Sequence, residues 1–231
     1  VKMKKILTIF ALGLLSLSLS AQESARWLRK SDISADGSTI AFSYQGDIFT
    51  VPVSGGLAKQ ITSNQAYDSD PLWTADGKSI VFSSFREDTK DIWIISAEGG
   101  KARRLTTFPG AETPLFVSKD GVVYFSANIQ PDVNYDKFPG EPQVYTVNIK
   151  DGKSSLYTSI PMMNISANSN GIVLYEDYKG YEDPLRKHHT SSVTRDIWKY
   201  LPKKGQYQKL SRFAGENRNP VFTSNGLDYY F

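Results

Sequence analysis

The sequence contains no cysteine and only two histidines, which are neighbours at His188 and His189. Without cysteine there are no disulfides and no thiol chemistry, so the core alone must hold the fold together. A convincing run of helical period is also missing, whereas aromatic residues, glycine and proline are frequent. This composition favours an all-β chain over a helical one.

The first residues have the pattern of a secretory signal peptide. Lys2, Lys4 and Lys5 form a basic start, an apolar run covers 6–19, and small residues follow up to Ala21. The apolar run is shorter than the roughly 20 residues that span a bilayer. We therefore expect 1–21 to be removed and the protein to be exported, periplasmic or secreted, with no membrane insertion afterwards.

The basic balance of the chain comes from this leader. The whole chain has 27 Lys and Arg against 24 Asp and Glu, and the three leader lysines account for the difference. The remaining chain is formally neutral, so the charge gives no reason to expect a nucleic-acid partner.

A turn signal recurs along the chain and marks an internal repeat. Asp-Gly or Asn-Gly between apolar runs is a strong hairpin signal, because glycine accepts a positive φ. The steps between the turn glycines are 40, 44, 50 and 55 residues. The signals are SADG, TADG, SKDG, NSNG and TSNG, which end at Gly37, Gly77, Gly121, Gly171 and Gly226.

Each turn signal lies inside a unit with four predicted strands. One strand precedes the signal, a second follows it, a third begins in most units with Asp-Ile, and a fourth closes the unit. This spacing predicts an all-β fold, a β-propeller of four-stranded antiparallel blades whose apolar faces are covered by neighbouring blades. We expect the propeller region at 22–231, with blades at about 25–62, 67–106, 112–158 and 162–211 and the first hairpin of a fifth at 217–231.

The predicted propeller is incomplete. The sequence stops at LDYYF, inside the strand after the fifth turn signal, and leaves that hairpin without further strands. Because an unpaired strand edge is a liability in a free protein, we expect the chain to be a fragment of a longer one.

The repeat resembles that of TolB-type propellers, in its turn signal, its Asp-Ile strand and its Gly-Gly turn. Two segments, SYQGDIFTVPVSGG and YEDYKGYEDPLRKHHTSSVTRDIW, are more narrowly similar to the N-terminal propeller of bacterial tricorn-like serine peptidases. In that family a PDZ domain and a serine peptidase domain follow the propeller. No residue here matches the family's catalytic set, so no catalytic residue can be assigned.

The resemblance implies a non-catalytic propeller that gates or docks a peptide or protein substrate, or docks downstream domains, of an exported serine peptidase. The chain alone is then not an enzyme, although its full-length parent is one, and homo-oligomers of the parent remain open. One alternative is a TolB-like periplasmic protein-binding propeller without enzymatic activity. Another is the propeller of a prolyl-oligopeptidase-type hydrolase. Neither a cofactor nor a metal is expected.

The connection between the second and third strands lengthens from blade to blade. The distance between matched strand positions grows from 6 residues in the first blade to 10, 19 and 22 in the next three. Because alternate connections of an up-and-down blade emerge on opposite faces, all the long ones are expected on one face. Loops carry function more often than their scaffold does, so we expect binding on this face.

The longest connection holds the candidate binding residues. Arg186, Lys187 and Arg195 offer cations for a carboxylate, such as an acidic peptide end, and His188 and His189 lie among them. A solvated structural loop is the plainer interpretation of the same residues.

Two further interpretations of this loop are weaker. Adjacent histidines in extended chain point in opposite directions and rarely share one metal ion. A Ser-His-Asp triad would need Ser191 or Ser192, one histidine and Asp196, but Asp47 and Asp91 occupy the same repeat position as Asp196. That repetition indicates a structural role for the aspartate.

Overall fold

The computed structural model describes residues 27–128, 142–180, 192–223 and 225–231, and these form an all-β propeller arc. Four sheets have four antiparallel strands each, and a two-stranded sheet follows them. The prediction of four blades and the first hairpin of a fifth is confirmed. Among the described residues no α-helix occurs, and none of the helical structure there is long and apolar enough to cross a membrane.

Within every blade the strands follow one another in sequence order. The first blade contains β1 (Arg29–Ile33), β2 (Thr39–Tyr44), β3 (Asp47–Pro52) and β4 (Lys59–Gln60). The second contains β5 (Asp68–Trp73), β6 (Ser79–Glu87), β7 (Thr89–Ser96) and β8 (Arg103–Arg104). The third contains β9 (Glu112–Val117), β10 (Val122–Ala127), β11 (Gln143–Asn148) and β12 (Ser154–Thr158).

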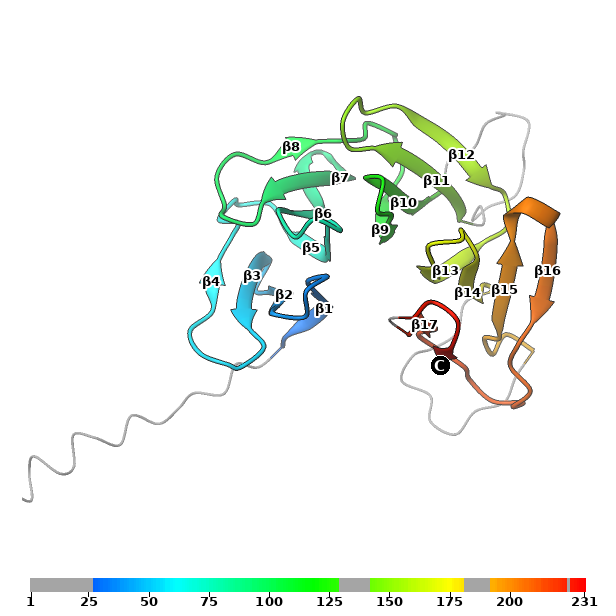
Figure 1. The fold of residues 1–231 in the computed structure, drawn as a ribbon. Helices are drawn as coiled ribbons and strands as arrows, with labels where there is room; N and C mark the ends of the chain where they lie inside the picture. The colour runs from blue at the N-terminus through cyan, green and yellow to red at the C-terminus, as the bar shows by residue number, and fades with distance from the viewer. Residues whose placement is uncertain (1–26, 129–141, 181–191, 224) are drawn as a thin grey trace, which may run out of the picture.

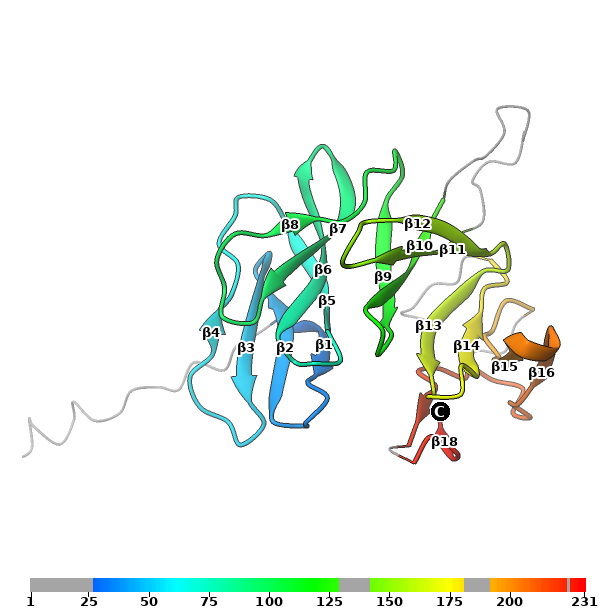
Figure 2. The ribbon, with the colours of Figure 1, turned by 45° about the horizontal axis from the view of Figure 1, so that its top comes forward.

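The fourth blade contains β13 (Met162–Ala167), β14 (Val173–Asp177), β15 (Ile197–Leu201) and β16 (Gln206–Lys209), with a single 3₁₀ turn, η2 (Pro202–Lys204), before β16. The last hairpin pairs β17 (Val221–Phe222) with β18 (Tyr229–Tyr230). In Figure 1 the first strands β1, β5, β9, β13 and β17 lie toward the inside of the arc, and the fourth strands lie at its rim. Figure 2 shows the second blade standing between the first and the third.

The predicted turn signals form tight turns between the first and second strands of each blade. In the first blade the N–H of Gly37 donates to the carbonyl of Ser34 at 2.8 Å, with Gly37 at a φ of 71°. The Asp36 carboxylate accepts from the Ser34 hydroxyl at 2.6 Å and from the Ser38 N–H at 3.0 Å. The turn residues therefore bond to one another, which fixes the register of the hairpin.

The apolar side chains pack between blades. One cluster joins the first two blades and contains Ala41 and Ile48 of the first with Phe82, Trp73 and Trp93 of the second. A second joins the second and third blades, and a third joins the third and fourth. Each sheet is therefore covered by its neighbours, as the repeat predicted.

The innermost strands carry an irregularity that the sequence pattern did not predict. The pairing of β5 with β6 shifts register between Ser69 and Leu72, and Asp70 within this shift has a φ of 54°. The pairing of β13 with β14 shifts in the same way around Asn164, which has a φ of 44°. Such bulges bend a strand and increase its twist.

A buried carboxylic acid lies at the junction of the second and third blades. Glu112 begins β9, and its Oε2 accepts from the Ile92 N–H at 3.1 Å and from the Thr106 hydroxyl. Its Oε1 has no partner among the described residues. Burial raises the pKa of Glu112 from 4.5 to about 7, although the bonds from Thr106 and Ile92 oppose the change.

This raised pKa predicts a pH-dependent effect of Glu112→Gln. Folding favours the protonated acid, so wild-type stability falls as the pH rises from 4.5 through 7. Glutamine carries no charge, so at pH 8 the variant should be more stable by about 1–3 kcal/mol. Urea unfolding at pH 8 and pH 5 measures this, and the difference should shrink at pH 5. A gain of equal size at both pH values would contradict the assignment.

Candidate functional site

The strands that the long connections of the third and fourth blades join end and begin on one face, where second strands end and third strands begin. These connections run from β10 to β11 and from β14 to β15, whereas only Gln45 and Gly46 join β2 to β3. In the second blade the expected longer loop is instead an extension of the strands, because β6 and β7 pair as far as Glu87 and Thr89. This face is called the loop face below.

Each third strand begins on the loop face, and two of these strands begin beside the same hydrogen-bonded clasp. In the first blade the Thr62 hydroxyl donates to Asp47 Oδ1 at 3.2 Å and accepts from the Ile48 N–H at 2.9 Å. In the fourth blade the Ser211 hydroxyl donates to Asp196 Oδ1 at 2.7 Å and accepts from the next N–H at 3.2 Å. The clasp ties the end of the fourth strand to the start of the third.

The other two blades vary this arrangement. In the second blade Thr106 accepts from the backbone but donates to Glu112, and Asp91 pairs instead with Arg104 at 2.9 Å. The third blade has Gln143 at the matching position, and its Oε1 accepts from the Tyr145 hydroxyl at 2.8 Å. Aspartate at this position is therefore a repeated structural feature, as the repeat indicated for Asp196.

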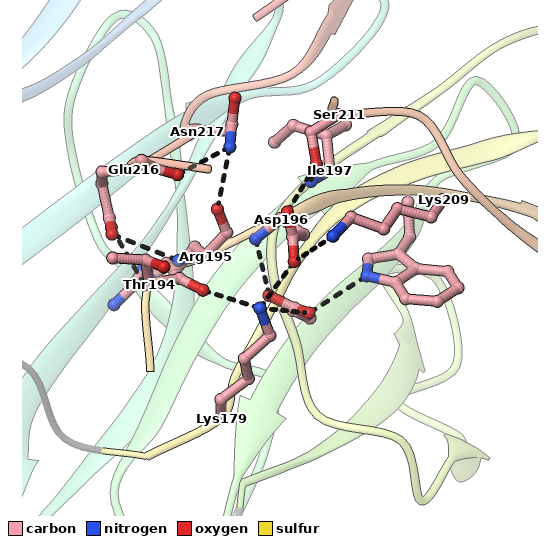
Figure 3. Close-up of polar contacts among 12 residues, drawn as sticks. Lys179, Thr194, Arg195, Asp196, Ile197, Lys209, Ser211, Glu216 and Asn217 are labelled. Atoms are coloured by element: carbon pink, nitrogen blue, oxygen red, sulfur yellow. Dashed lines mark hydrogen bonds and ion pairs between the residues drawn. The ribbon is translucent and has the colours of Figure 1, made fainter. Parts of the chain in front are cut away.

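Two lysines converge on the fourth-blade clasp, as Figure 3 shows. Lys179 Nζ lies 2.6 Å and Lys209 Nζ 2.8 Å from Asp196 Oδ2. Lys179 also donates to the Thr194 carbonyl at 2.7 Å. Asp177 accepts from the Asp196 N–H at 2.8 Å, which adds a second carboxylate to the cluster.

This cluster determines the charge state of its central carboxyl. Burial opposes ionisation of Asp196, but the bonds from Lys179, Lys209 and Ser211 outweigh it and hold its pKa at about 2. For Lys179 burial also opposes the charge, and the two aspartates raise its pKa above 10.5. Both groups are therefore charged at neutral pH, and neither is poised for proton transfer.

Arg195 is the one predicted binding residue that the structure describes. Its guanidinium pairs with Glu176 Oε2 at 2.7 Å, and the backbone N–H of Arg195 donates to Glu216 Oε2 at 3.1 Å. Asn217 Nδ2 donates to its carbonyl at 3.2 Å (Figure 3). A ligand carboxylate would have to compete with Glu176 for this cation, so binding at Arg195 stays a prediction.

The remaining predicted binding residues, Arg186, Lys187, His188 and His189, lie outside the described residues. Ser191 of the weaker triad hypothesis lies outside them too. Within the described part of the chain no group of three His, Cys, Asp or Glu residues is placed to hold a metal ion.

Glu176 connects the fourth blade to the last hairpin, a role that sequence reasoning missed. Its side chain is fully buried. Its Oε1 accepts from Asn164 Nδ2 and from the Asn219 N–H, both at 2.6 Å. Asn219 precedes β17, so one carboxylate joins Arg195, a bulged inner strand and the next hairpin. Glutamate inside an apolar strand (VLYED) was the available signal.

A cavity of about 750 Å³ lies among the first strands, and sequence reasoning did not predict it. Its wall contains a half-buried carboxyl, Asp32, whose Oδ2 accepts from the Trp73 N–H at 2.7 Å. Burial raises the pKa of Asp32, although that hydrogen bond opposes the change. The lining also includes Phe116, Tyr124, Asn164 and Pro220. The cavity is mixed in polarity, which suits an uncharged, partly polar occupant such as extended peptide.

Comparison with known proteins identifies the repeat class. Residues 25–231 match the family model described as the tricorn protease N-terminal beta propeller domain. The uncharacterized peptidase YuxL of Bacillus subtilis (strain 168) is 38% identical over 81 residues, which cover 34% of this chain and 12% of that protein.

Two solved structures share the fold. The crystal structure of the tricorn protease matches with a TM-score of 0.68 and 21% identity, over 85% of this chain and 19% of that one. TolB from Acinetobacter baumannii matches with a TM-score of 0.61 and 17% identity, over 86% of this chain and 47% of that one. The chain thus spans less than half the length of each of these proteins.

Because two lysines pair with Asp196, we expect Asp196→Asn to destabilise the fold more than Asp47→Asn does. Both changes keep the clasp's shape, but only Asp196 lies in an ion pair within the described residues. At pH 7 we expect the free energy of unfolding to fall by about 1–3 kcal/mol in Asp196→Asn and by under about 1 kcal/mol in Asp47→Asn.

Urea unfolding of the wild type and the two variants measures these differences in the free energy of unfolding. Because the folded pKa of Asp196 is lowered, its stabilisation is present above pH 3.8 and is lost as the pH falls toward 2. Equal losses in the two variants at pH 7 would show that the lysines contribute nothing.

Proposed function

Because the chain belongs to the tricorn protease N-terminal β-propeller family, we propose that it is the non-catalytic propeller region of an exported serine peptidase. In this proposal the propeller gates or docks peptide substrate, or docks neighbouring domains of the same protein. The hydrolytic residues lie elsewhere in the parent protein. The family match over 25–231 is the observation that carries the proposal.

The described clusters on the loop face support a non-catalytic role. The Ser211 hydroxyl, the one beside Asp196, is buried and already bonded to Asp196 and to the Ile197 N–H. The negative charge of Asp196 is itself paired with two lysines. A nucleophile needs a free hydroxyl and a base within hydrogen-bond reach, and this cluster offers neither.

The loop face supports a binding role. The two longest connections start and end on this face, and the longest one joins strands at the fourth-blade clasp and its ion pairs, which is the arrangement of a binding loop on a stable scaffold. The cavity among the first strands gives a second contact region for extended peptide. Export is proposed from the leader pattern at 1–21, with a periplasmic or secreted location.

A TolB-like protein-binding propeller without enzymatic activity is the second candidate, favoured by the shared fold with TolB. The coding sequence beyond Phe231 separates the two candidates. A serine peptidase domain there supports the first, and a stop after the last blade of a closed propeller supports the second.

The binding role predicts that the basic loop matters for large substrates. In the full-length protein, replacing Arg186, Lys187, His188 and His189 together by alanine should slow cleavage of an unfolded protein several-fold. Cleavage of a short fluorogenic peptide should change little, because the reacting groups are untouched. Turnover of both substrates measures this.

The matched control is Lys203→Ala with Lys204→Ala. These exposed lysines lie in η2, on the opposite face of the same blade, so their removal should leave both rates unchanged. If the loop variant cleaves both substrates at the wild-type rate, the loop has no part in substrate handling.

A further inference from the structure

The first-to-second-strand turns of the fourth blade and the last hairpin both contain Ser-Asn-Gly, at Asn170 and Asn225. Both turns close with the same backbone hydrogen bond. Gly171 N–H donates to the Asn168 carbonyl at 3.0 Å, and Gly226 N–H donates to the Thr223 carbonyl at 2.8 Å. Both asparagines are exposed, so neither local sequence nor exposure distinguishes them.

The side chain of Asn225 is held by four hydrogen bonds. Its Oδ1 accepts from the Thr223 hydroxyl at 2.5 Å, from the Leu227 N–H at 2.8 Å and from the Asp228 N–H at 3.2 Å. Its Nδ2 donates to Asp228 Oδ2 at 3.1 Å. Rotation of this amide toward the following peptide bond would break all four.

The side chain of Asn170 forms no hydrogen bond to any residue that the structure describes. The equivalent role in this turn is taken by Asn168, whose Oδ1 accepts from the N–H groups of Asn170 at 3.1 Å and Ile172 at 3.0 Å. The amide of Asn170 is therefore free to rotate toward Gly171, and glycine leaves the attacking nitrogen without steric cover.

We infer that Asn170 is a site of non-enzymatic deamidation. The deprotonated backbone nitrogen of Gly171 attacks the Asn170 side-chain carbonyl carbon, and ammonia leaves as a five-membered succinimide closes. Water then opens the ring at either carbonyl, which gives aspartate or isoaspartate. The net change is the addition of one water and the loss of one ammonia, and no other reactant is needed.

The two products differ in their effect on the fold. Aspartate is the residue that stands at this turn position in the first three blades, as Asp36, Asp76 and Asp120. Isoaspartate adds an atom to the backbone between residue 170 and Gly171. It would disturb the bonds of Asn168, whose Nδ2 also donates to the Gly226 carbonyl at 2.8 Å and so joins the fourth blade to the last hairpin.

Peptide mapping of the full protein after incubation at mildly alkaline pH tests this inference. The one-dalton mass gain and isoaspartyl methyltransferase labelling are followed separately for the peptides with Asn170 and Asn225. In the folded protein we expect Asn170 to deamidate at least about fivefold faster than Asn225, since a factor of this size corresponds to one ordinary hydrogen bond.

The unfolded chain is the internal control. In denaturant the two identical Ser-Asn-Gly sequences should react at similar rates, because no side-chain bonds remain. Asn170→Ala should abolish the one-dalton mass gain in the peptide that contains residue 170 and leave the mass gain in the peptide that contains Asn225 unchanged. Equal rates in the folded protein, or a faster reaction at Asn225, would overturn the inference.

Discussion

Burial of each sheet's apolar faces against the neighbouring sheets is the interaction on which the rest of the structure depends. A single four-stranded blade has two apolar faces and no interior of its own, so its strands are stable only beside another blade. The three apolar clusters each join two blades, and fully buried residues such as Phe82 and Phe125 lie in them. This packing positions the loop face and the cavity among the first strands, because the first strands lie side by side only when the blades are packed together.

Polar groups complete the blade junctions where the apolar packing ends. Glu112 joins the second and third blades, and Glu176 joins the fourth blade to the hairpin that follows. The cations of the described loop face are paired with carboxylates of the chain itself, as Arg195 and Lys179 illustrate. Removing one partner of a buried pair is costly, because it leaves the other charge uncompensated. The face is thus a rigid frame from which the longer connections emerge.

Much of the fold could be predicted from the sequence, because its signals are local. The Asp-Gly turns, the alternating strands and the matched position of Asp47, Asp91 and Asp196 all repeat along the chain. The candidate site was harder to predict, because it depends on contacts between residues that are distant in the sequence. Glu176 meets Arg195 and Asn219 only after the blades assemble. The bulge at Asn164, with its positive φ, likewise leaves no signal in the alternation of apolar residues along the strand.

Hydrogen exchange in Phe82→Ala tests the dependence of one blade on the next most directly. Phe82 lies in β6 and packs against the first blade, and truncating a buried phenylalanine costs about 3–5 kcal/mol. The account predicts faster amide exchange in β2 and β3 as well as in β6 and β7, while Phe85→Ala, at an exposed position of the same strand, changes neither. Unchanged protection of β2 and β3 in Phe82→Ala would contradict it.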